Sequence, residues 1–379
     1  MANLPYGVFS AGDAPRIGVR VGDSVLDLAR ALSEQVFSEP SLNTFMAQGR
    51  ARWSDVRARI TELLTDARHR GTVESALRPL SAVDLHLPFA PGDYVDFFGN
   101  EYHAANAGRI FRPGGAGLTP NWKHLPVGYH GRSGTVVVSG TPVTRPCGQR
   151  PSSDGPTFGP SRRLDFEAEV GFVVGVASSG PVPVSDFAEH VFGVFLVNDW
   201  SARDLQAWEA QPLGPFLAKS FATSISPWVV PLEALEGARV SPPPRDPEPL
   251  PYLADTDKWG LDLALEVRLN GQVVARPPYA RTYWTAAQML AHMTVNGAPA
   301  RTGDMFASGT VSGPDRDQRG CLLELSWGGA EPLTLADGSV RSFLEDGDEV
   351  TISATAPAAG GGRIGFGEVT GQIRPAAGP

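Results

Sequence analysis

Two stretches, RLDFEAEVGF at residues 163–172 and VFGVFLVND at residues 191–199, decide how this chain folds. In the first stretch every second residue is apolar, and the residues between them are Asp165, Glu167, Glu169 and Gly171. Alternation with a period of two predicts a half-buried β-strand with three carboxylates in a row on one face. The second stretch is an apolar run that ends in Asn198-Asp199, which predicts a buried strand with an acid at its tip.

Three of these acids, Glu167, Glu169 and Asp199, could converge on one point, because strands hold their side chains stiffly. Carboxylates that lie so close repel one another and take up protons unless a cation lies between them. The pattern therefore indicates a cation site. The alternative is an acidic strand face in contact with water, which is common on protein surfaces.

Composition limits the class of protein. A chain of 379 residues, 42 % of them hydrophobic, is long enough for two domains, or for one large domain with an appendage, around a sizeable core. The 43 glycines and 34 prolines favour many short strands and turns over long helices. The net charge of −9 argues against binding to nucleic acid or to an anionic membrane.

Other features point to a cytoplasmic protein. The two cysteines form no CxxC motif, so neither a disulfide framework nor a thiolate zinc site is expected. The first residues lack the basic and apolar regions of a signal peptide, and no run of 18 apolar residues could span a membrane.

The first 88 residues are predicted to form a small β-containing lobe. We expect a hairpin around Gly22-Asp23, helices over residues 25–35 and 52–68, and a linker at Leu85–Gly92. Later elements are expected to be a hairpin around Asn270-Gly271, a loop over 238–258, a helix over 284–293, and short strands and turns over 321–327.

Two local motifs bring polar residues towards the acids. A strand at 94–98 followed by a helix from about Asn100 would turn Asp96 and His103 to one cavity, although a helical histidine is more often simply hydrogen-bonded. Ser201-x-x-Asp204 resembles a capping box, and the helix it would start places Arg203 and Gln206 on one face. The alternative is an ordinary surface helix.

These residues suit one kind of chemistry. Carboxylate oxygens without cysteine or several histidines favour Mg²⁺ or Ca²⁺ over Zn²⁺, and here they are Asp96, Glu167, Glu169 and Asp199. A histidine oriented by a glutamate, as His103 by Glu324, suits activation of water. Arg203, Gln206 and Lys219 could stabilise a developing oxyanion. The set fits hydrolysis of a diketone better than phosphoryl transfer, although from these residues alone it is one assembly among several.

Over nearly its whole length the chain resembles the fumarylacetoacetase family. The stretches that carry the resemblance include NLPYGVFS at 3–10, PNWKHLPVGYHGR at 120–132, RLDFEAEVGF at 163–172, HVFGVFLVNDWSARD at 190–204, PLGPFLAKSF at 212–221 and LLELSW at 322–327. The resemblance implies a mainly β, α+β fold, in which an SH3-like β-barrel domain (1–88) precedes a mixed β-roll catalytic domain (89–379). It also implies a homodimer and a diketo acid substrate, 4-fumarylacetoacetate, cleaved to fumarate and acetoacetate in tyrosine and phenylalanine breakdown.

The resemblance also implies roles for single residues. Asp96, Glu167, Glu169 and Asp199 match the ligands of a calcium or magnesium ion, and Lys219 and Thr223 match positions around a second, structural magnesium. His103 matches the base that activates water and Glu324 its partner, while Arg203, Gln206 and Lys219 match the oxyanion donors. The matching substrate contacts are Arg112, Tyr129, Gln206 and Thr310.

Two substrate positions depart from the family pattern, because Phe98 and Ala210 stand where the family has tyrosines. Losing a hydroxyl that bonds a buried polar group costs about 1–3 kcal/mol. A paralogue acting on another diketone or acylpyruvate is therefore an alternative. Two further alternatives are an isomerase or decarboxylase with a similar metal site, and a metal-containing binding protein without turnover.

Overall fold

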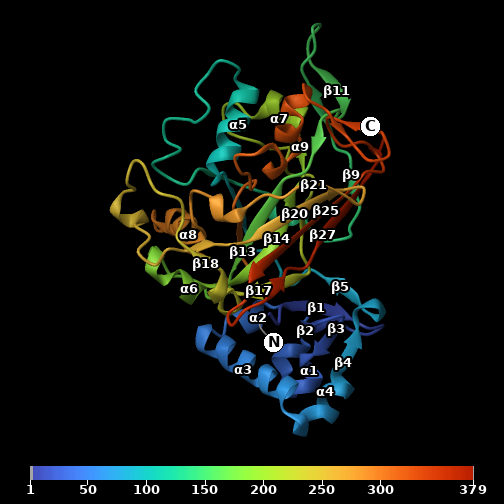
Figure 1. The fold of residues 1–379 in the computed structure, drawn as a ribbon, viewed down its shortest axis with the longest axis vertical. Helices are drawn as coiled ribbons and strands as arrows, with labels where there is room; N and C mark the ends of the chain where they lie inside the picture. The colour runs from blue at the N-terminus through green and yellow to red at the C-terminus, as the bar shows by residue number, and fades with distance from the viewer. Residues whose placement is uncertain (1–2, 379) are drawn as a thin grey trace.

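The computed structural model describes residues 3–378, and it has a mixed α+β architecture in which strands predominate (Figure 1). An N-terminal lobe lies at one end of the molecule, and the remaining residues form a larger body above it. The strands of the lobe are β1 (Tyr6–Ser10), β2 (Arg16–Val21), β3 (Ser24–Asp27), β4 (Leu77–Pro79) and β5 (Asp84–His86). Its helices are α1 (Leu28–Leu32), α2 (Asn43–Met46), α3 (Arg50–Thr65) and α4 (Arg70–Ala76).

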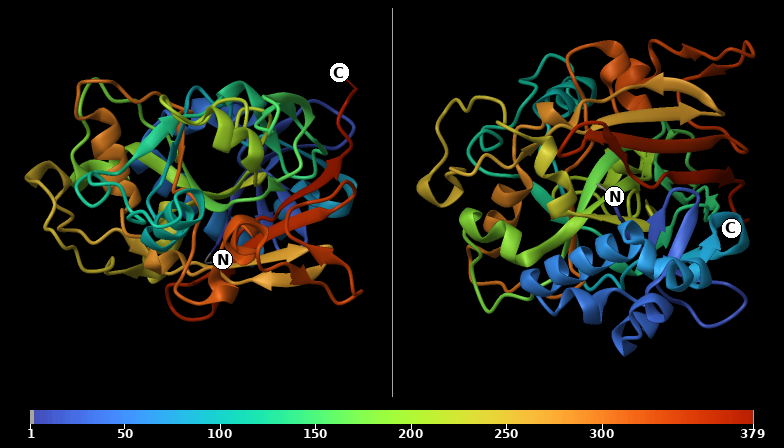
Figure 2. Two further views of the ribbon diagram at one scale, coloured as in Figure 1. Left: turned by 90° about the horizontal axis from the view of Figure 1, so that it is seen from above. Right: turned by 60° about the horizontal axis from the view of Figure 1, so that its bottom comes forward.

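The lobe follows most of its local signals. The hairpin at Gly22-Asp23 is confirmed, because β2 and β3 pair antiparallel with Val21 opposite Ser24. The helix expected over 25–35 begins only at Leu28, since residues 25–27 belong to β3. Part of the expected linker is also strand, because Leu85 and His86 pair with β1. Figure 2 brings the lobe's helices forward, where they cover one side of its strands.

The lobe's strands continue into the main sheet. Strand β1 pairs with β17 (Trp228–Pro231), so the sheet runs β4-β3-β2-β1-β17-β14-β13-β22-β6-β7. No pairing among residues 3–378 closes the N-terminal strands into a barrel, and the SH3-like barrel stays a prediction.

The central strands bring acids from distant parts of the chain together. Strand β13 (Ala168–Val174) pairs antiparallel with β14 (Val191–Asp199) on one side and with β22 (Met305–Ala307) on the other. Strand β22 pairs in parallel with β6 (Tyr94–Phe97), which pairs with β7 (Gly128–His130). Strand β16 (Thr223–Ile225) joins the end of β14 and pairs with β8 (Val136–Val138). Glu169 and Asp199 therefore lie on adjacent strands, and the strand of Asp96 is separated from that of Glu169 only by β22.

The prediction of a half-buried strand over 163–172 was wrong in two respects. The strand is interrupted, because β12 (Leu164–Asp165) pairs with β15 (Ser201–Ala202) and β13 starts only at Ala168. Both faces of β13 are also buried. The lobe's core covers the second face, where a Cβ at Gly171 would lie 2.4 Å from the ring of Phe195.

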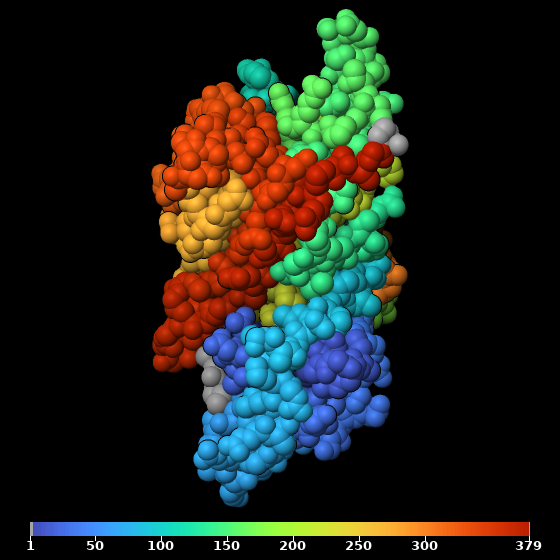
Figure 3. Space-filling view, turned by 90° about the vertical axis from the view of Figure 1, so that its right-hand side faces the viewer, coloured from blue at the N-terminus to red at the C-terminus, as the bar shows by residue number. Residues whose placement is uncertain are grey.

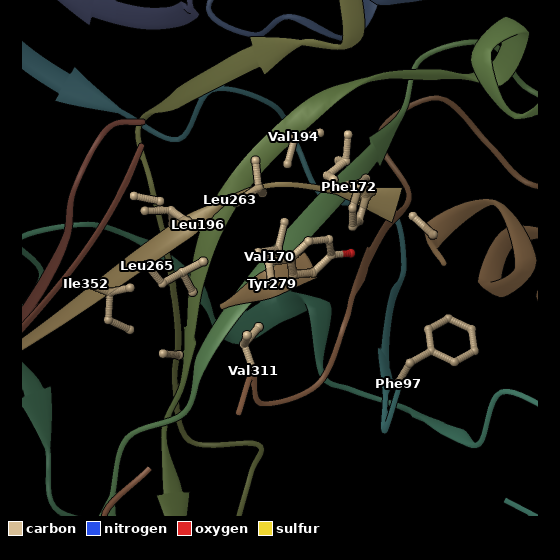
Figure 4. Close-up of a cluster of buried hydrophobic side chains, with 14 of the residues drawn as sticks. Phe97, Val170, Phe172, Val194, Leu196, Leu263, Leu265, Tyr279, Val311 and Ile352 are labelled. Carbon is tan, nitrogen blue, oxygen red and sulfur yellow. The ribbon is translucent and has the colours of Figure 1, made fainter. Parts of the chain in front are cut away.

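A second sheet packs over the first face of the central strands. It contains β21 (Gln272–Ala275), β20 (Ala264–Leu269), β25 (Glu349–Pro357), β27 (Val369–Arg374), β9 (Val143–Thr144) and β26 (Arg363–Gly365). Leu265 and Ile352 of this sheet lie in one hydrophobic cluster with Val170 and Leu196 of the central sheet (Figure 4). The hairpin at Asn270-Gly271 is confirmed by the pairing of β20 with β21.

The helices of the larger body carry site residues or cover the core. They are α5 (Glu101–Phe111), α6 (Phe187–His190), α7 (Arg203–Glu209), α8 (Ala286–Thr294) and α9 (Leu322–Leu325). The helix expected over 284–293 is confirmed as α8, whereas α9 lies where strands and turns were expected. Helices α5, α7 and α9 lie near one another at the end away from the lobe (Figure 1).

The remaining strands are short. They are β10 (Cys147–Arg150), β11 (Thr157–Pro160), β18 (Arg239–Val240), β19 (Gly260–Leu261), β23 (Leu333–Thr334) and β24 (Val340–Arg341). The β10–β11 hairpin projects from the end of the molecule opposite the lobe (Figure 3). Within residues 3–378, none of the helices has the length and apolar character needed to cross a membrane.

Candidate active site

Four buried carboxylates from three strands and one strand junction form the centre of the candidate site. Each offers an oxygen within 4.8 Å of the others, and they belong to Asp96, Glu167, Glu169 and Asp199. Asp96 comes from β6, Glu169 from β13 and Asp199 from the last position of β14, while Glu167 lies between β12 and β13. The sequence pattern therefore predicted this convergence, although it assigned no geometry to it.

Several oxygens of this cluster have no hydrogen-bond donor. Both carboxylate oxygens of Glu169 and Oδ1 of Asp96 are buried without a partner among the described residues. A buried polar atom without a partner is costly, so native proteins usually satisfy such atoms. Oxygen atoms of this kind, gathered at one point, fit a hard divalent cation. The four carboxylates could thus hold Mg²⁺ or Ca²⁺.

The acids divide into two electrostatic classes. Burial raises the pKa of Glu169 and of Asp96 well above the usual range, and the neighbouring carboxylates raise each pKa further. Burial also raises the pKa of Glu167. The positive charges of Lys219 and Arg203 outweigh burial and hold the pKa of Glu167 below its ordinary value. Without a cation the cluster is therefore only partly neutralised by the chain itself.

Lys219 lies against one side of the cluster. Its buried ammonium group contacts Glu167 and donates to Oδ2 of Asp199 at 2.9 Å. The Oγ1 of Thr223 donates to Oδ1 of Asp199 at 2.8 Å, and the hydroxyl of Tyr129 donates to Oδ2 at 3.0 Å. Both Asp199 oxygens thus have donors, unlike those of Glu169.

His103 and Glu324 form a buried pair beside the acids. Asn100 caps helix α5 by accepting from the backbone N–H of His103 at 3.0 Å, as the expected helix start near Asn100 predicts. The Nδ1 of His103 lies 2.6 Å from Oε2 of Glu324, and its Nε2 lies 3.9 Å from Oε1 of Glu167. The imidazole therefore bridges Glu324 and the acid cluster.

Glu324 is surrounded by donors that the sequence did not indicate. Its oxygens accept from Asn106 Nδ2 at 2.9 Å, from Ser312 Oγ at 2.8 Å and from the Cys321 thiol at 3.2 Å. Burial raises the pKa of Glu324, but His103, Asn106 and Ser312 together hold this pKa below its ordinary value. Asn106 lies one helical turn after His103, so helical spacing could have found it.

Arg203 lies beside the acid cluster. Its Nη1 lies 2.7 Å from Oε1 of Glu167 and donates to Oε1 of Gln206 at 3.1 Å, as the expected shared helix face predicts. Its Nη2 is buried and has no hydrogen-bond partner within residues 3–378. The expected capping box was wrong, because Asp204 accepts instead from Ser161 and from the backbone of Arg162.

This arrangement of acids, imidazole and guanidinium can be compared with known families. The model described as fumarylacetoacetate hydrolase C-terminal matches residues 96–374, and the one described as fumarylacetoacetase N-terminal matches residues 2–88. The chain belongs to the fumarylacetoacetase family. Members of this family named fumarylacetoacetase from Bos taurus and Homo sapiens are 47 % and 45 % identical to it. Each alignment covers 99 % of this chain and 96 % of the relative.

Solved structures support the same fold. The fumarylacetoacetate hydrolase from Exiguobacterium antarcticum has a TM-score of 0.60 at 18 % identity, over 99 % of this chain and all of that one. The 5-carboxymethyl-2-hydroxymuconate delta-isomerase from Mycobacterium smegmatis has a TM-score of 0.56 at 17 % identity, over 98 % of this chain and all of that one. At these identities the likeness concerns the fold alone.

The residues that match family substrate contacts lie in different surroundings. Phe98 packs edge-on against the His103 imidazole, with ring centroids 5.2 Å apart. Thr310 is buried, and its hydroxyl has no partner among the described residues. Ala210 is half-buried at the end of α7, whereas Arg112 is exposed at the end of α5. The described contacts therefore tie Phe98 to the site, and they do not tie Arg112 to it.

Proposed function

We propose that this fumarylacetoacetase-family hydrolase cleaves a carbon–carbon bond of 4-fumarylacetoacetate, giving fumarate and acetoacetate. The observation that carries the proposal is the buried His103–Glu324 pair, in which Nε2 of His103 lies 3.9 Å from Oε1 of Glu167 in the acid cluster. The relatives named fumarylacetoacetase, which align over nearly their whole length, support the choice of substrate.

The acid cluster is proposed to hold Mg²⁺ or Ca²⁺. The residues that would ligate it are Asp96, Glu167, Glu169 and Asp199, and the partnerless oxygens of Glu169 and Asp96 support this assignment. When bound, such an ion neutralises the acids and polarises substrate oxygens. Lys219 and Thr223 hold Asp199 in place and are proposed to lie near a second, structural ion.

His103 is proposed to activate the attacking water. Glu324 accepts a hydrogen bond from the Nδ1–H of His103, and this tautomer leaves Nε2 with a lone pair that is able to take a proton from water. The resulting hydroxide adds to the carbonyl carbon of the fumaroyl group. The bond from that carbon to its neighbour then breaks, fumarate forms, and the departing carbon takes a proton to give acetoacetate.

Arg203 is proposed to stabilise the charge that develops on the ketone oxygen. Its Nη2 is a buried donor without a partner in the described part of the chain. It is held rigidly because the other nitrogens of Arg203 bond Asp165, Glu167 and Gln206. Preorganised donors in a site without water are an effective form of stabilisation. Gln206 and Lys219 are proposed to assist, and Tyr129, Thr310 and Arg112 to contact substrate.

A second candidate substrate, which differs from 4-fumarylacetoacetate in its acyl group, follows from Phe98 and Ala210. Phe98 offers a ring edge to His103 where a tyrosine would add a hydroxyl, and Ala210 leaves more space than a tyrosine. These two positions favour a related diketone or acylpyruvate with a bulkier or less polar acyl group as the alternative substrate. Isomerase activity, decarboxylase activity and binding without turnover are less well supported. None of these three alternatives uses a histidine–glutamate pair to activate water.

The test is loss of the diketone's ultraviolet absorbance, followed by identification of the products. We expect the wild type with added Mg²⁺ to release fumarate and acetoacetate, and His103→Ala to lose at least about a hundredfold in kcat. His69→Ala, in the N-terminal lobe, is the matched control and should keep the wild-type rate. Release of a single rearranged product, or equal rates in His103→Ala and wild type, would refute the proposal.

We further propose a homodimer in the cytoplasm, with a domain boundary near residue 88. The two matched family regions, which end at 88 and begin again at 96, support the boundary. Large apolar side chains at Phe158, Trp208 and Phe216 are exposed in the single chain, which supports association. Light scattering on the purified protein tests the dimer.

A further inference from the structure

Asp165 does not join the acid cluster, although it belongs to the same alternating sequence. The break between β12 and β13 separates it from Glu169, and its carboxylate is fully buried elsewhere. It lies between the guanidinium of Arg203 and the first two residues of α9, the short helix that carries Glu324.

Each oxygen of this carboxylate has two donors. Oδ1 accepts from the backbone N–H groups of Leu322 at 2.7 Å and Phe166 at 2.8 Å. Oδ2 accepts from Nε of Arg203 at 2.8 Å and from the N–H of Leu323 at 2.9 Å. One side chain thus binds segments that are separated by more than a hundred residues of sequence.

These contacts connect both working parts of the site. Arg203 extends from Asp165 to Glu167, at 2.7 Å from Nη1 to Oε1, and so reaches the acid cluster. Leu322 and Leu323 directly precede Glu324, which holds His103 at 2.6 Å. A shift of Asp165 would therefore move the guanidinium relative to the imidazole.

We propose that Asp165 is a positioning residue, which fixes Arg203 and the backbone before Glu324 in one frame so that the guanidinium and the imidazole act on the same substrate. This inference rests on the proposed function. Because Asp165 contacts neither His103 nor the acid cluster, it would act only through these neighbours. Residues that hold catalytic groups in this indirect way typically change activity by ten- to a hundredfold.

Asparagine is the informative replacement, because it retains the size of the side chain and removes one acceptor. All four neighbours of Asp165 are N–H donors, so the new amide nitrogen would face two of them. Asp165→Glu keeps both oxygens and provides a second variant if the asparagine protein does not fold.

A matched control exists in the same chain. Asp348 is also buried, accepts from the guanidinium of Arg341 at 2.8 Å and from the backbone N–H of Glu345 at 2.8 Å, and is bonded by Asn270. None of these partners belongs to the proposed site. Asp348→Asn should therefore disturb folding in a similar way without moving a catalytic group.

The experiment measures kcat, KM and the urea midpoint for Asp165→Asn, Asp165→Glu, Asp348→Asn, Arg203→Lys and the Asp165→Asn/Arg203→Lys double variant. We expect Asp165→Asn to lower kcat about ten- to a hundredfold with a smaller change in KM. Asp165→Glu should recover part of kcat, and Asp348→Asn should stay within about twofold of wild type. The double variant should be little worse than Arg203→Lys alone, because the two residues act as one unit.

Three results would overturn the inference. They are equal kcat in Asp165→Asn and Asp348→Asn, multiplicative losses in the double variant, and independent urea shifts from the two substitutions. Absence of turnover in the wild type would instead refute the proposed function. In that case the urea measurements alone decide whether Asp165 and Arg203 are coupled.

Discussion

The acid cluster and the His103–Glu324 pair are neighbours, yet they differ in how many hydrogen-bond donors the chain offers to their carboxylates. Glu324 accepts from four side chains, so the chain itself satisfies its carboxylate oxygens. Glu169 accepts from none among the described residues, and burial among like charges raises its pKa. The difference indicates that one half of the site is preorganised by the fold alone, and it supports our proposal that a cation completes the other half.

The largest effect should come from removing the divalent ion. We expect a chelator to lower kcat about a thousandfold or more. Without the ion, the oxygen atoms of the substrate would face negatively charged carboxylates that repel them. Mg²⁺ added back should restore the rate, measured by absorbance loss. A rate unchanged after verified removal of all divalent ions would show that the cluster needs no cation.

A smaller loss of activity should follow when the His103–Glu324 pair, the preorganised half of the site, is disturbed. Glu324→Gln places an amide against some of the donors that now surround the carboxylate, and His103 loses its charged partner. We expect kcat to fall about a hundred- to a thousandfold, with cation affinity nearly unchanged. Glu331→Gln is an exposed control. A parallel loss of cation binding would contradict the separation of the two halves.

Phe98, which packs against His103, allows a test with a smaller expected effect. Phe98→Tyr returns the hydroxyl that the family pattern has beside His103, and one hydrogen bond is worth about 1 kcal/mol. We expect kcat/KM for 4-fumarylacetoacetate to rise several-fold, up to about tenfold. Phe111→Tyr, at the exposed end of helix α5, which carries His103, serves as the control. A fall in kcat/KM would favour the alternative, less polar substrate.

The smallest effect concerns Asp348, a buried acid that lies outside the site. Burial raises its pKa, but bonds from Arg341 and Asn270 outweigh this and hold the pKa below the ordinary value. Its folded-state pKa is therefore lower than the unfolded value of about 3.9. The stabilisation is present above that value and is lost as the pH falls through the folded pKa. Asp348→Asn should lower the melting temperature by a few degrees at pH 7, and much less near pH 3.

The sequence predicted the acid cluster because its signals are local. The alternating run and the apolar strand before Asp199 each place an acid at a definite position, and pairing of β13 with β14 then brings Glu169 and Asp199 together. The helix start at Asn100 is also a local signal, and it orients His103. Hairpins with glycine turns were predicted for the same reason.

The features that the sequence did not predict depend on distant partners. Asp165 looks like one more acid of the strand, but it bonds Leu322, 157 residues later. The segment LLEL looks like strand or turn, and it forms α9 where backbone N–H groups find that carboxylate. Ser201 and Asp204 have the spacing of a capping box, yet the carboxylate of Asp204 accepts hydrogen bonds from Ser161 and Arg162 instead. Tertiary contacts override local preference in each case.

The most direct test of the central claim is calorimetric titration of Mg²⁺ and Ca²⁺ into chelator-treated protein. We compare the wild type with Glu169→Gln, which removes one charged ligand without changing the size of the side chain. We predict saturable binding to the wild type and binding at least about tenfold weaker in Glu169→Gln. Equal affinity in the two proteins, or no binding to the wild type, would contradict it.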